Sequence, residues 1–454
     1  MNQILILLGK IISALSKITN LGSGSTWPGE IALITNPNIL AHFFNKVKKG
    51  IIIIAGTNGK TTTAKMVQEM ISSQYPIDTI VHNDSGANLL NGITSAFIKK
   101  AKIITNSYFD WAVLEVDENT LPILLKYHLS HKDTSDGVRI KTPPRWPARL
   151  PAGREGTPRM VEKPAKPKIV IALLNLFRDQ LDRYGEVDTI VSKWLSALKN
   201  YLGKVNLITN ADDPTIAYMG LSCQKNVTFF GIDKAKGIKE IEHATDSIFC
   251  PLCGHKLSYE AVYYSHIGRW ACPSCNLNRP KIQTASIKTK LPGLYNFYNT
   301  QCAVLIAQTI GIKESNIKSA LQNFTPAFGR QEEFSINGKK IKIFLSKNPV
   351  GFNESLKTVI DLGARQVLLV LNDRIPDGRD VSWIWDVDFE IIPENTQIIA
   401  SGERCYDLAL RLKYAGKKFE IEKDLRKSIQ SDYILPTYSA MLEVRKILTG
   451  KKIL

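Results

Sequence analysis

The stretch Gly50-Ile-Ile-Ile-Ile-Ala-Gly56-Thr-Asn-Gly-Lys60-Thr-Thr62 decides the fold. Its unbroken apolar run, 51–55, is typical of a parallel strand that is buried on both faces. Apolar residues then recur at helical spacing, at Met66, Val67, Met70 and Ile71. The stretch therefore predicts a strand, a glycine-rich loop and a helix in that order, which is the opening unit of a doubly wound parallel sheet.

Such a loop binds anions, because its backbone N–H groups and the start of the following helix point at one place. Lys60 would bring a positive charge to the outer phosphates, and Thr61 would offer its hydroxyl to Mg²⁺. The match to the generic phosphate loop is imperfect, since Ile54 stands where the first glycine belongs. We expect a mononucleotide site with ATP as its ligand, formed by Gly56, Thr57, Asn58, Gly59, Lys60, Thr61 and Thr62.

Acidic residues end the next predicted strand, at Glu115, Asp117 and Glu118. An acid at the carboxyl edge of a parallel sheet faces the crevice where ligands bind. One of the three is expected to complete a Mg²⁺ shell with Thr61. Glu115 and Asp117 share a face, and spacing alone does not choose between them.

Four cysteines form the strongest metal pattern, in Cys-Pro-Leu-Cys and Cys-Pro-Ser-Cys, at Cys250, Cys253, Cys272 and Cys275. Two such turns supply the closed tetrahedral shell of four sulfurs that Zn²⁺ prefers in structural sites. The alternatives are two disulfides or four unrelated buried thiols. Zinc is favoured, because nothing in the sequence indicates secretion.

The chain as a whole predicts an α/β protein with two units. Further buried strands are expected at 111–116, 169–173, 205–209, 366–371 and 397–400, and helices at 355–362 and 405–414. We expect an N-terminal helical segment (1–45), a central ATPase unit on a parallel sheet (46–329) and a C-terminal Rossmann-like unit (330–454). The central unit would contain a flexible Pro- and Arg-rich insertion (128–167) and the zinc ribbon (246–280).

The net charge of +17 over 454 residues favours phosphorylated ligands, nucleic acid or an anionic membrane surface as partners. No stretch approaches the ~20 apolar residues that span a bilayer, and the start does not read as a signal peptide. We therefore expect a cytoplasmic protein. Residues 1–17 predict an amphipathic helix. We expect it to dock on the rest of the protein; the alternative is that it binds the inner face of the plasma membrane.

Three polar segments follow predicted strands. Residues 175–186 are expected to handle substrate or phosphate, with surface salt bridges as the alternative. Residues 210–214 either line the nucleotide pocket or cap a helix. Residues 372–386 hold four carboxylates and two tryptophans, which favours a contact with a partner or substrate.

Together these motifs resemble the Mur ligases, whose phosphate loop matches Gly56–Thr62. The cysteine ribbon, Phe177–Gln180, Asn348–Asn353 and Asp377–Asp380 followed by Ser-Trp-Ile-Trp-Asp are similar to the MurT-type ligase subunits of lipid II isoglutaminyl synthase. The resemblance covers nearly the whole chain except the Pro- and Arg-rich stretch. It implies ATP-dependent amidation, through an acyl phosphate, of the α-carboxylate of D-glutamate in lipid II.

The resemblance also implies residue roles. Lys60 and Thr61 would hold the phosphates and Mg²⁺, Glu115 would bind Mg²⁺, and Asn299 would contact the nucleotide. Asp380 would complete the catalytic triad of a separate GatD-type glutaminase subunit. Lys60 and Asp380 are thus the expected catalytic residues, and the four ribbon cysteines the expected zinc ligands.

A partner is also indicated by the remaining cysteines, Cys223, Cys302 and Cys405, because none lies in a glycine-flanked turn that would present a nucleophile. Two other functions stay open. One is another ligase of the same fold, such as a folylpolyglutamate synthase or an amino-acid-adding Mur ligase. The other is a nucleic-acid-binding ATPase with a zinc ribbon, which we do not expect, because only Trp146 interrupts the arginine-rich run.

Overall fold

The computed structural model describes residues 2–450 apart from 20–25, 85, 104–106, 130–166, 180–186, 224, 234–244, 286, 288–289, 327–328 and 337. The expected insertion at 128–167 therefore lies almost wholly outside the described residues. No helix in the described ranges is both long and apolar enough to cross a bilayer.

A six-stranded parallel sheet forms the centre of the molecule, in the order β2-β3-β1-β4-β5-β6. Its strands are β1 (Val47–Ala55), β2 (Ile80–His82), β3 (Phe109–Val116), β4 (Lys168–Leu173), β5 (Asn206–Asn210) and β6 (Val227–Phe230). The predicted strand–loop–helix unit is confirmed, and β1 begins four residues earlier than the apolar run. The order in which strands are added to the sheet reverses between β1 and β4. The carboxyl ends of these two strands therefore flank the crevice where ligands bind in such folds.

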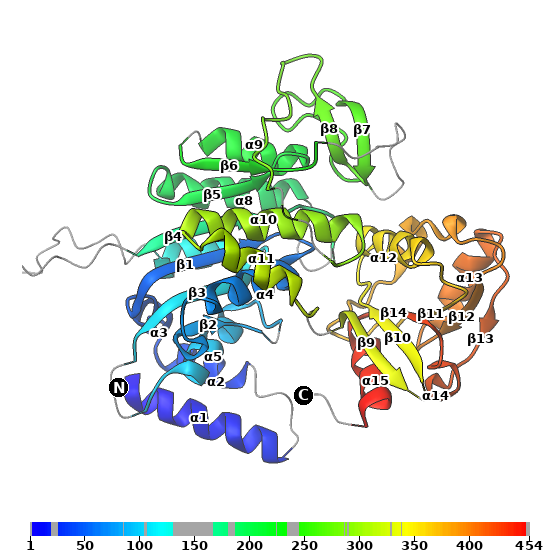
Figure 1. Ribbon diagram of the computed structural model, residues 1–454, viewed down its shortest axis with the longest axis horizontal. Helices are drawn as coiled ribbons and strands as arrows, with labels where there is room; N and C mark the ends of the chain where they lie inside the picture. Colours follow the sequence, from blue (N-terminus) through cyan, green and yellow to red (C-terminus); the bar gives the residue numbers. More distant parts are fainter. Residues whose placement is uncertain are drawn as a thin grey trace, which may run out of the picture.

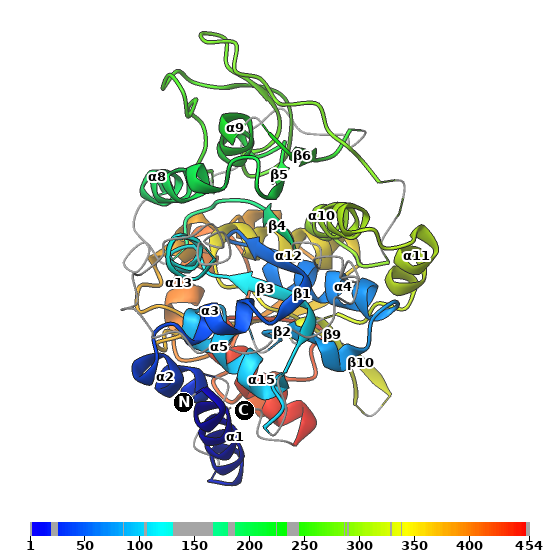
Figure 2. The same cartoon turned by 90° about the vertical axis from the view of Figure 1, so that its left-hand side faces the viewer.

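Both faces of this sheet are covered, which explains the unbroken isoleucine run. Ile51 and Ile53 pack into one core, and Ile52 and Ile54 into the other. The first core lies under α1 (Asn2–Thr19), α2 (Trp27–Thr35), α3 (Ile39–Phe44), α5 (Leu90–Lys100), α6 (Thr120–Ile123), α8 (Val187–Leu198) and α9 (Pro214–Cys223). The second lies under α4 (Lys60–Ser72), α10 (Leu294–Ile310) and α11 (Glu314–Gln322), as Figure 2 shows.

The C-terminal unit is a second six-stranded sheet, in the order β13-β12-β11-β14-β10-β9, beside the first in Figure 1. Its strands are β9 (Arg330–Ile336), β10 (Lys339–Phe344), β11 (Gln366–Val370), β12 (Gln397–Ser401), β13 (Glu420–Ile421) and β14 (Tyr433–Pro436). Its helices are α12 (Pro349–Asp361), α13 (Cys405–Tyr414), α14 (Leu425–Ser428) and α15 (Tyr438–Thr449). The sheet is mixed rather than wholly parallel, because β9 and β10 form an antiparallel pair.

Helix α13 has the predicted bounds, whereas α12 begins six residues before the predicted helix. Its first turn carries the signals of a helix start, since Asn348 caps it by accepting from Gly351 N at 2.8 Å and Pro349 follows. A separate hairpin, β7 (Ser258–Tyr264) and β8 (Ile267–Ala271), projects at the end of the molecule opposite α1 (Figure 1).

Candidate functional site

The glycine-rich loop after β1 ends at Gly59, which caps α4 with a φ of 91°. That backbone conformation favours glycine, and a Cβ there would lie 2.1 Å from Asn299 Oδ1. Asn299, predicted from the resemblance, thus borders the loop from α10. No side chain caps the start of α4, so its first N–H groups are available to an anion.

The residues that follow β4 hold this loop in place. Asn175 accepts from Asn58 N at 2.8 Å and donates to Asn58 O at 3.1 Å, and Thr57 N donates to Asn175 O at 2.9 Å. Phe177 N donates to Thr57 Oγ1 at 3.0 Å. The segment 175–177 therefore fixes the shape of the loop through its backbone and through the side-chain amide of Asn175.

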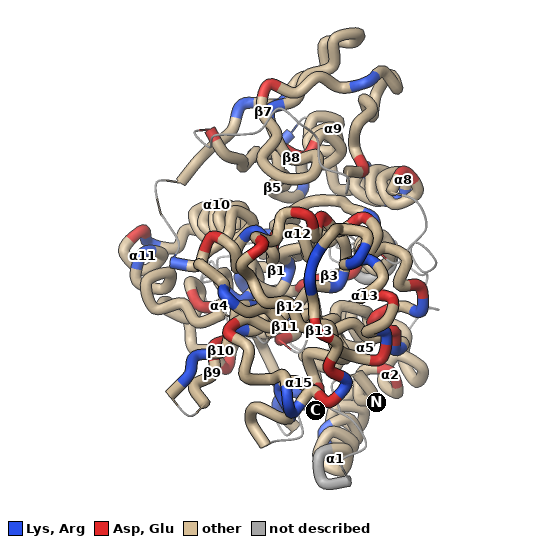
Figure 3. Tube along the Cα trace, turned by 90° about the vertical axis from the view of Figure 1, so that its right-hand side faces the viewer, with Lys and Arg blue, Asp and Glu red and all other residues tan. Residues whose placement is uncertain are grey.

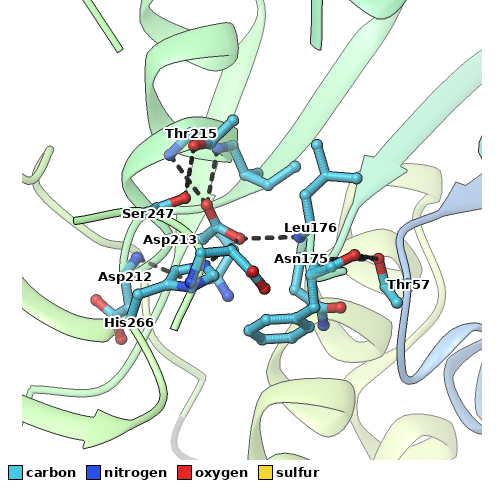
Figure 4. A network of polar contacts seen from close by, with 12 residues as sticks. Thr57, Asn175, Leu176, Asp212, Asp213, Thr215, Ser247 and His266 are labelled. Atoms are coloured by element: carbon cyan, nitrogen blue, oxygen red, sulfur yellow. Dashed lines mark hydrogen bonds and ion pairs between the residues drawn. The ribbon is translucent and has the colours of Figure 1, made fainter. Parts of the chain in front are cut away.

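Asp213 fixes that segment in turn, as Figure 4 shows. Its Oδ2 accepts from Leu176 N at 3.0 Å, and its Oδ1 accepts from Thr215 N and Ile216 N, both at 3.0 Å. For residues 210–214 the sequence offered two roles, lining the nucleotide pocket or capping a helix. The contacts of Asp213 with Thr215 N and Ile216 N are those of a helix cap. The same carboxylate also binds the backbone of Leu176, just after β4. The spacing of residues in the sequence did not predict this contact.

Lys60 is only 7% exposed and lies inside the loop. It donates to Gly56 O and, at 3.3 Å, to Thr57 O, and its Nζ is 3.4 Å from Glu118 Oε1. Burial raises the pKa of Glu118, and the charge of Lys60 opposes that rise. Of the three acids at the carboxyl end of β3, Glu118 is the one that pairs with the lysine.

Glu115 is the acid that faces the hydroxyl of Thr61. Their atoms Oε2 and Oγ1 are 2.5 Å apart, and the other carboxylate oxygen, Oε1, is buried with no hydrogen-bond partner among the described residues. Asn83 holds the backbone of Glu115 at both N–H and C=O. A carboxylate oxygen and a hydroxyl beside an anion-binding loop form a ligand set that fits Mg²⁺.

The C-terminal unit closes the site with basic groups that the sequence did not predict. Lys347 Nζ is 2.5 Å from Asp179 Oδ2. Burial would lower the pKa of Lys347, but Asp179 and Glu118 outweigh it, so the pKa is raised. Burial lowers the pKa of Arg330, and the charge of Glu115 opposes this. Arg330 and Lys347 are isolated basic residues near the start of the C-terminal unit and belong to no recognisable motif. Their place at the site could therefore not be predicted from the sequence.

An amide pair joins the two units directly at the loop. Asn58 Nδ2 donates to Asn348 Oδ1 at 3.3 Å, and Asn348 Nδ2 donates to Asn58 Oδ1 at 3.1 Å. A cleft lies beside this pair. Its lining is mixed, with polar residues that include Asn58, Asn299 and Arg330 and with the apolar residues Phe177, Tyr264, Leu291, Tyr295, Phe344, Leu345 and Val350.

The four predicted metal ligands lie together. All four sulfurs are within 4.8 Å of one another, with Cys250 and Cys275 Sγ 3.6 Å apart and Cys253 and Cys272 Sγ 3.5 Å apart. Tetrahedral zinc with Zn–S bonds of about 2.3 Å holds its sulfurs about 3.8 Å apart. The separations fit one shared ion and are too long for disulfides.

Asp380 lies in the segment after β11. It is exposed and accepts from Ser382 N at 2.8 Å. This hydrogen bond from the backbone holds its pKa below the usual range. Among the described residues, the cleft lining includes neither Asp380 nor Lys60.

Comparison with known proteins agrees with this arrangement. The family model "MurT ligase C-terminal" matches residues 345–441. The chain is 31% identical to the lipid II isoglutaminyl synthase (glutamine-hydrolyzing) subunit MurT of Staphylococcus aureus, over 92% of this chain and 91% of that one. It is 30% identical to the Streptococcus pneumoniae protein of the same name, over 96% and 95%.

Solved structures share the fold. A pseudomurein peptide ligase type C from Methanothermus fervidus aligns with a TM-score of 0.58 at 19% identity, covering 89% of this chain and 79% of that one. MurF from Acinetobacter baumannii aligns with a TM-score of 0.57 at 14% identity, covering 91% and 80%. With its Mur-ligase fold and its full-length similarity to those two subunits, the chain belongs to the MurT family of lipid II isoglutaminyl synthase ligase subunits.

Proposed function

We propose that this chain amidates the α-carboxylate of D-glutamate in the lipid II stem peptide to D-isoglutamine, at the expense of ATP. The observation that carries the proposal is the contact between Thr61 and Glu115 beside the glycine-rich loop. In the part of the chain that the structure describes, it leaves one buried carboxylate oxygen without a hydrogen-bond partner, and such an oxygen can bind Mg²⁺. A cation site beside an anion-binding loop suits phosphoryl transfer, in which a metal ion bridges the phosphates of the nucleotide.

The chemistry follows from the cations around the loop. A carboxylate is a poor electrophile, and transfer of the γ-phosphoryl group to it gives an acyl phosphate and releases ADP. Ammonia then attacks the carbonyl carbon, the amide forms, and inorganic phosphate leaves. Lys60, Lys347 and Arg330 surround the site with positive charge that stabilises the transferring phosphoryl group. Mg²⁺, when bound by Thr61 and Glu115, neutralises phosphate charge.

The ammonia comes from a partner. Cys223, Cys302 and Cys405 are each buried, at 8% exposure or less, and burial raises the pKa of Cys302 and of Cys223. These thiols are poor nucleophiles, since the thiolate is the reactive form. A GatD-type glutaminase subunit is the proposed source.

A surface near Asp380 suits that partner. Tyr406, Leu410 and Tyr414 lie on one face of α13 and are 61%, 49% and 73% exposed. Trp385, 46% exposed, packs edge-on against Tyr414 with ring centroids 5.3 Å apart. Aromatic groups of this kind anchor protein interfaces. We propose that the glutaminase docks here and receives Asp380 as the third member of its triad.

Helix α1 has an exposed apolar face that suits contact with a membrane, where a lipid-linked substrate is found. Ile4, Leu7, Leu8 and Ile11 are 61%, 41%, 45% and 45% exposed, at a spacing that places them along one face. The helix has no acidic residue, as Figure 3 illustrates. We propose that this face rests on the inner face of the plasma membrane, which places the protein in the cytoplasm.

Reconstitution tests the proposed function. The chain, co-purified with its glutaminase, should convert lipid II to the amidated form only when ATP, Mg²⁺ and glutamine are all present. Lys60→Ala should abolish the conversion, because the outer phosphates lose their cation. Lys193→Ala, an exposed lysine on α8, is the matched control and should be fully active. Retained activity in Lys60→Ala, measured by mass spectrometry of the muropeptides, contradicts the assignment.

A further inference from the structure

Strand β9, at the edge of the C-terminal sheet (Figure 1), contains a bulge at the residue that follows Arg330. In its antiparallel pairing with β10, Glu332 lies opposite Ile343, whereas Arg330 lies opposite the next residue, Phe344. Two steps along β9 thus match one step along β10, so Gln331 is the extra residue of a bulge. Its φ of 61° lies in the left-handed region, where such a bulge normally has glycine.

The bulge decides which side of the sheet Arg330 faces. Residues opposite each other in an antiparallel pair point to the same side, and successive residues of one strand point to opposite sides. Ile343 and Phe344 accordingly pack into different cores of the C-terminal unit. Glu332 binds Arg445 on α15, whereas Arg330 lines the cleft. In an unbroken strand Arg330 and Glu332 would share one side, so the bulge turns Arg330 toward the cleft.

The side chain of Gln331 ties this bulge to the central unit. Its Nε2 donates to Pro292 O at 2.9 Å and to Tyr295 Oη at 2.6 Å, at the start of α10. Gln331 is 8% exposed, and its Oε1 has no hydrogen-bond partner among the described residues. The amide is therefore held through its N–H groups, and it joins the two units at the point where β9 begins.

We propose that Gln331 is a positioning residue, which forms the bulge and, through its two bonds to the central unit, aims Arg330 at the phosphoryl group that is transferred. The inference rests on the proposed function, in which Arg330 supplies positive charge to that group. Arg330 lines the cleft together with Asn58 and Gly59 of the loop. A left-handed backbone strains any residue that has a Cβ, and such strain persists where the surrounding contacts impose it. The two bonds of the Gln331 amide are contacts of this kind.

Amidation with free ammonium, measured on the chain in complex with its glutaminase, tests this role without the glutaminase reaction. Gln331→Ala should lower kcat about tenfold and leave the KM for ATP within about twofold, because a misplaced Arg330 is lost to the transition state. Gln331→Gly should lose as much kcat but melt at a higher temperature than Gln331→Ala, since glycine takes the left-handed φ without strain. The control is Asn226→Gly, a left-handed residue (φ 54°) just before β6, which should be fully active.

A double variant shows whether Gln331 acts through Arg330. Arg330→Ala combined with Gln331→Ala should be no slower than Arg330→Ala alone, and losses that multiply overturn the inference. Gln331→Gly replaces Gln331→Ala throughout if the alanine variant does not fold. An unchanged kcat in the Gln331 variants, with or without a lower melting temperature, overturns the inference and leaves the proposed function standing. No amidation by the unsubstituted complex overturns both.

Discussion

At the scale of single residues, the site is a set of buried polar groups that each have a defined task. The unpartnered oxygen of Glu115 marks a place for a cation, and Lys60 and Lys347 each pair with a carboxylate. Buried charges without a partner are costly. Pairing with Glu118 and Asp179 thus offsets part of the cost of burying the two lysines beside the loop.

Asp380 should affect only the use of glutamine. Asp380→Asn removes the charge that would orient the histidine of the glutaminase, so glutamine-dependent amidation should fall by about 10⁴-fold, as for the equivalent change in a triad. Amidation with free ammonium should survive, because the loop and its cations are unchanged. Asp361→Asn, at the exposed end of α12, should leave both activities intact. Equal loss of both activities in Asp380→Asn would contradict the assigned role.

His82 should make stability depend on pH. It is buried, and burial lowers its pKa below the ordinary value of about 6.5. The folded state thus favours the neutral ring, so its contribution to stability is complete above about pH 6.5 and is lost as the pH falls further. The melting temperature should drop more between about pH 7.5 and 5.5 in the unsubstituted chain than in His82→Gln. Parallel curves would exclude this residue as the cause.

At the scale of elements, the ribbon is both a metal-binding module and a support for the site. Its sulfurs are arranged for one ion at one end, and its turn lies behind the loop segment at the other. The spacing of the four cysteines was sufficient to predict the metal-binding end. At the turn end, His266 packs on Phe177, which lies far away in the sequence. Contacts of this kind leave no local pattern from which they could be predicted.

Removal of zinc should show both roles. Chelation should lower the melting temperature and expose Trp270, which is 2% exposed and packs with Cys250 and Cys272, so its fluorescence should shift to longer wavelength. Affinity for a non-hydrolysable ATP analogue should fall with it, because the hairpin turn, whose His266 packs on Phe177 beside the loop, loses its anchor. Cys223→Ser, outside the cluster, should keep its full zinc content. An unchanged melting temperature after complete removal of the metal would contradict this account.

At the scale of the whole molecule, the strand–loop–helix unit and the parallel sheet were predictable, because the run 51–55 and the following glycines fix local structure unambiguously. The antiparallel pair β9 and β10 was missed, since its short, charged strands carry no buried run. Arg330 and Lys347 were missed for another reason. They reach the site only because the two units face each other there, a property of packing between units and not of either sequence segment.

Phosphoryl transfer to the α-carboxylate should precede the attack of ammonia. Lipid II labelled with the heavy oxygen isotope in that carboxylate, incubated with the complex, ATP and glutamine, tests it directly. The account predicts that one labelled oxygen appears in the inorganic phosphate for each amide formed, because the acyl phosphate leaves with the oxygen that joined it to the substrate. Amide formation with unlabelled phosphate would contradict it.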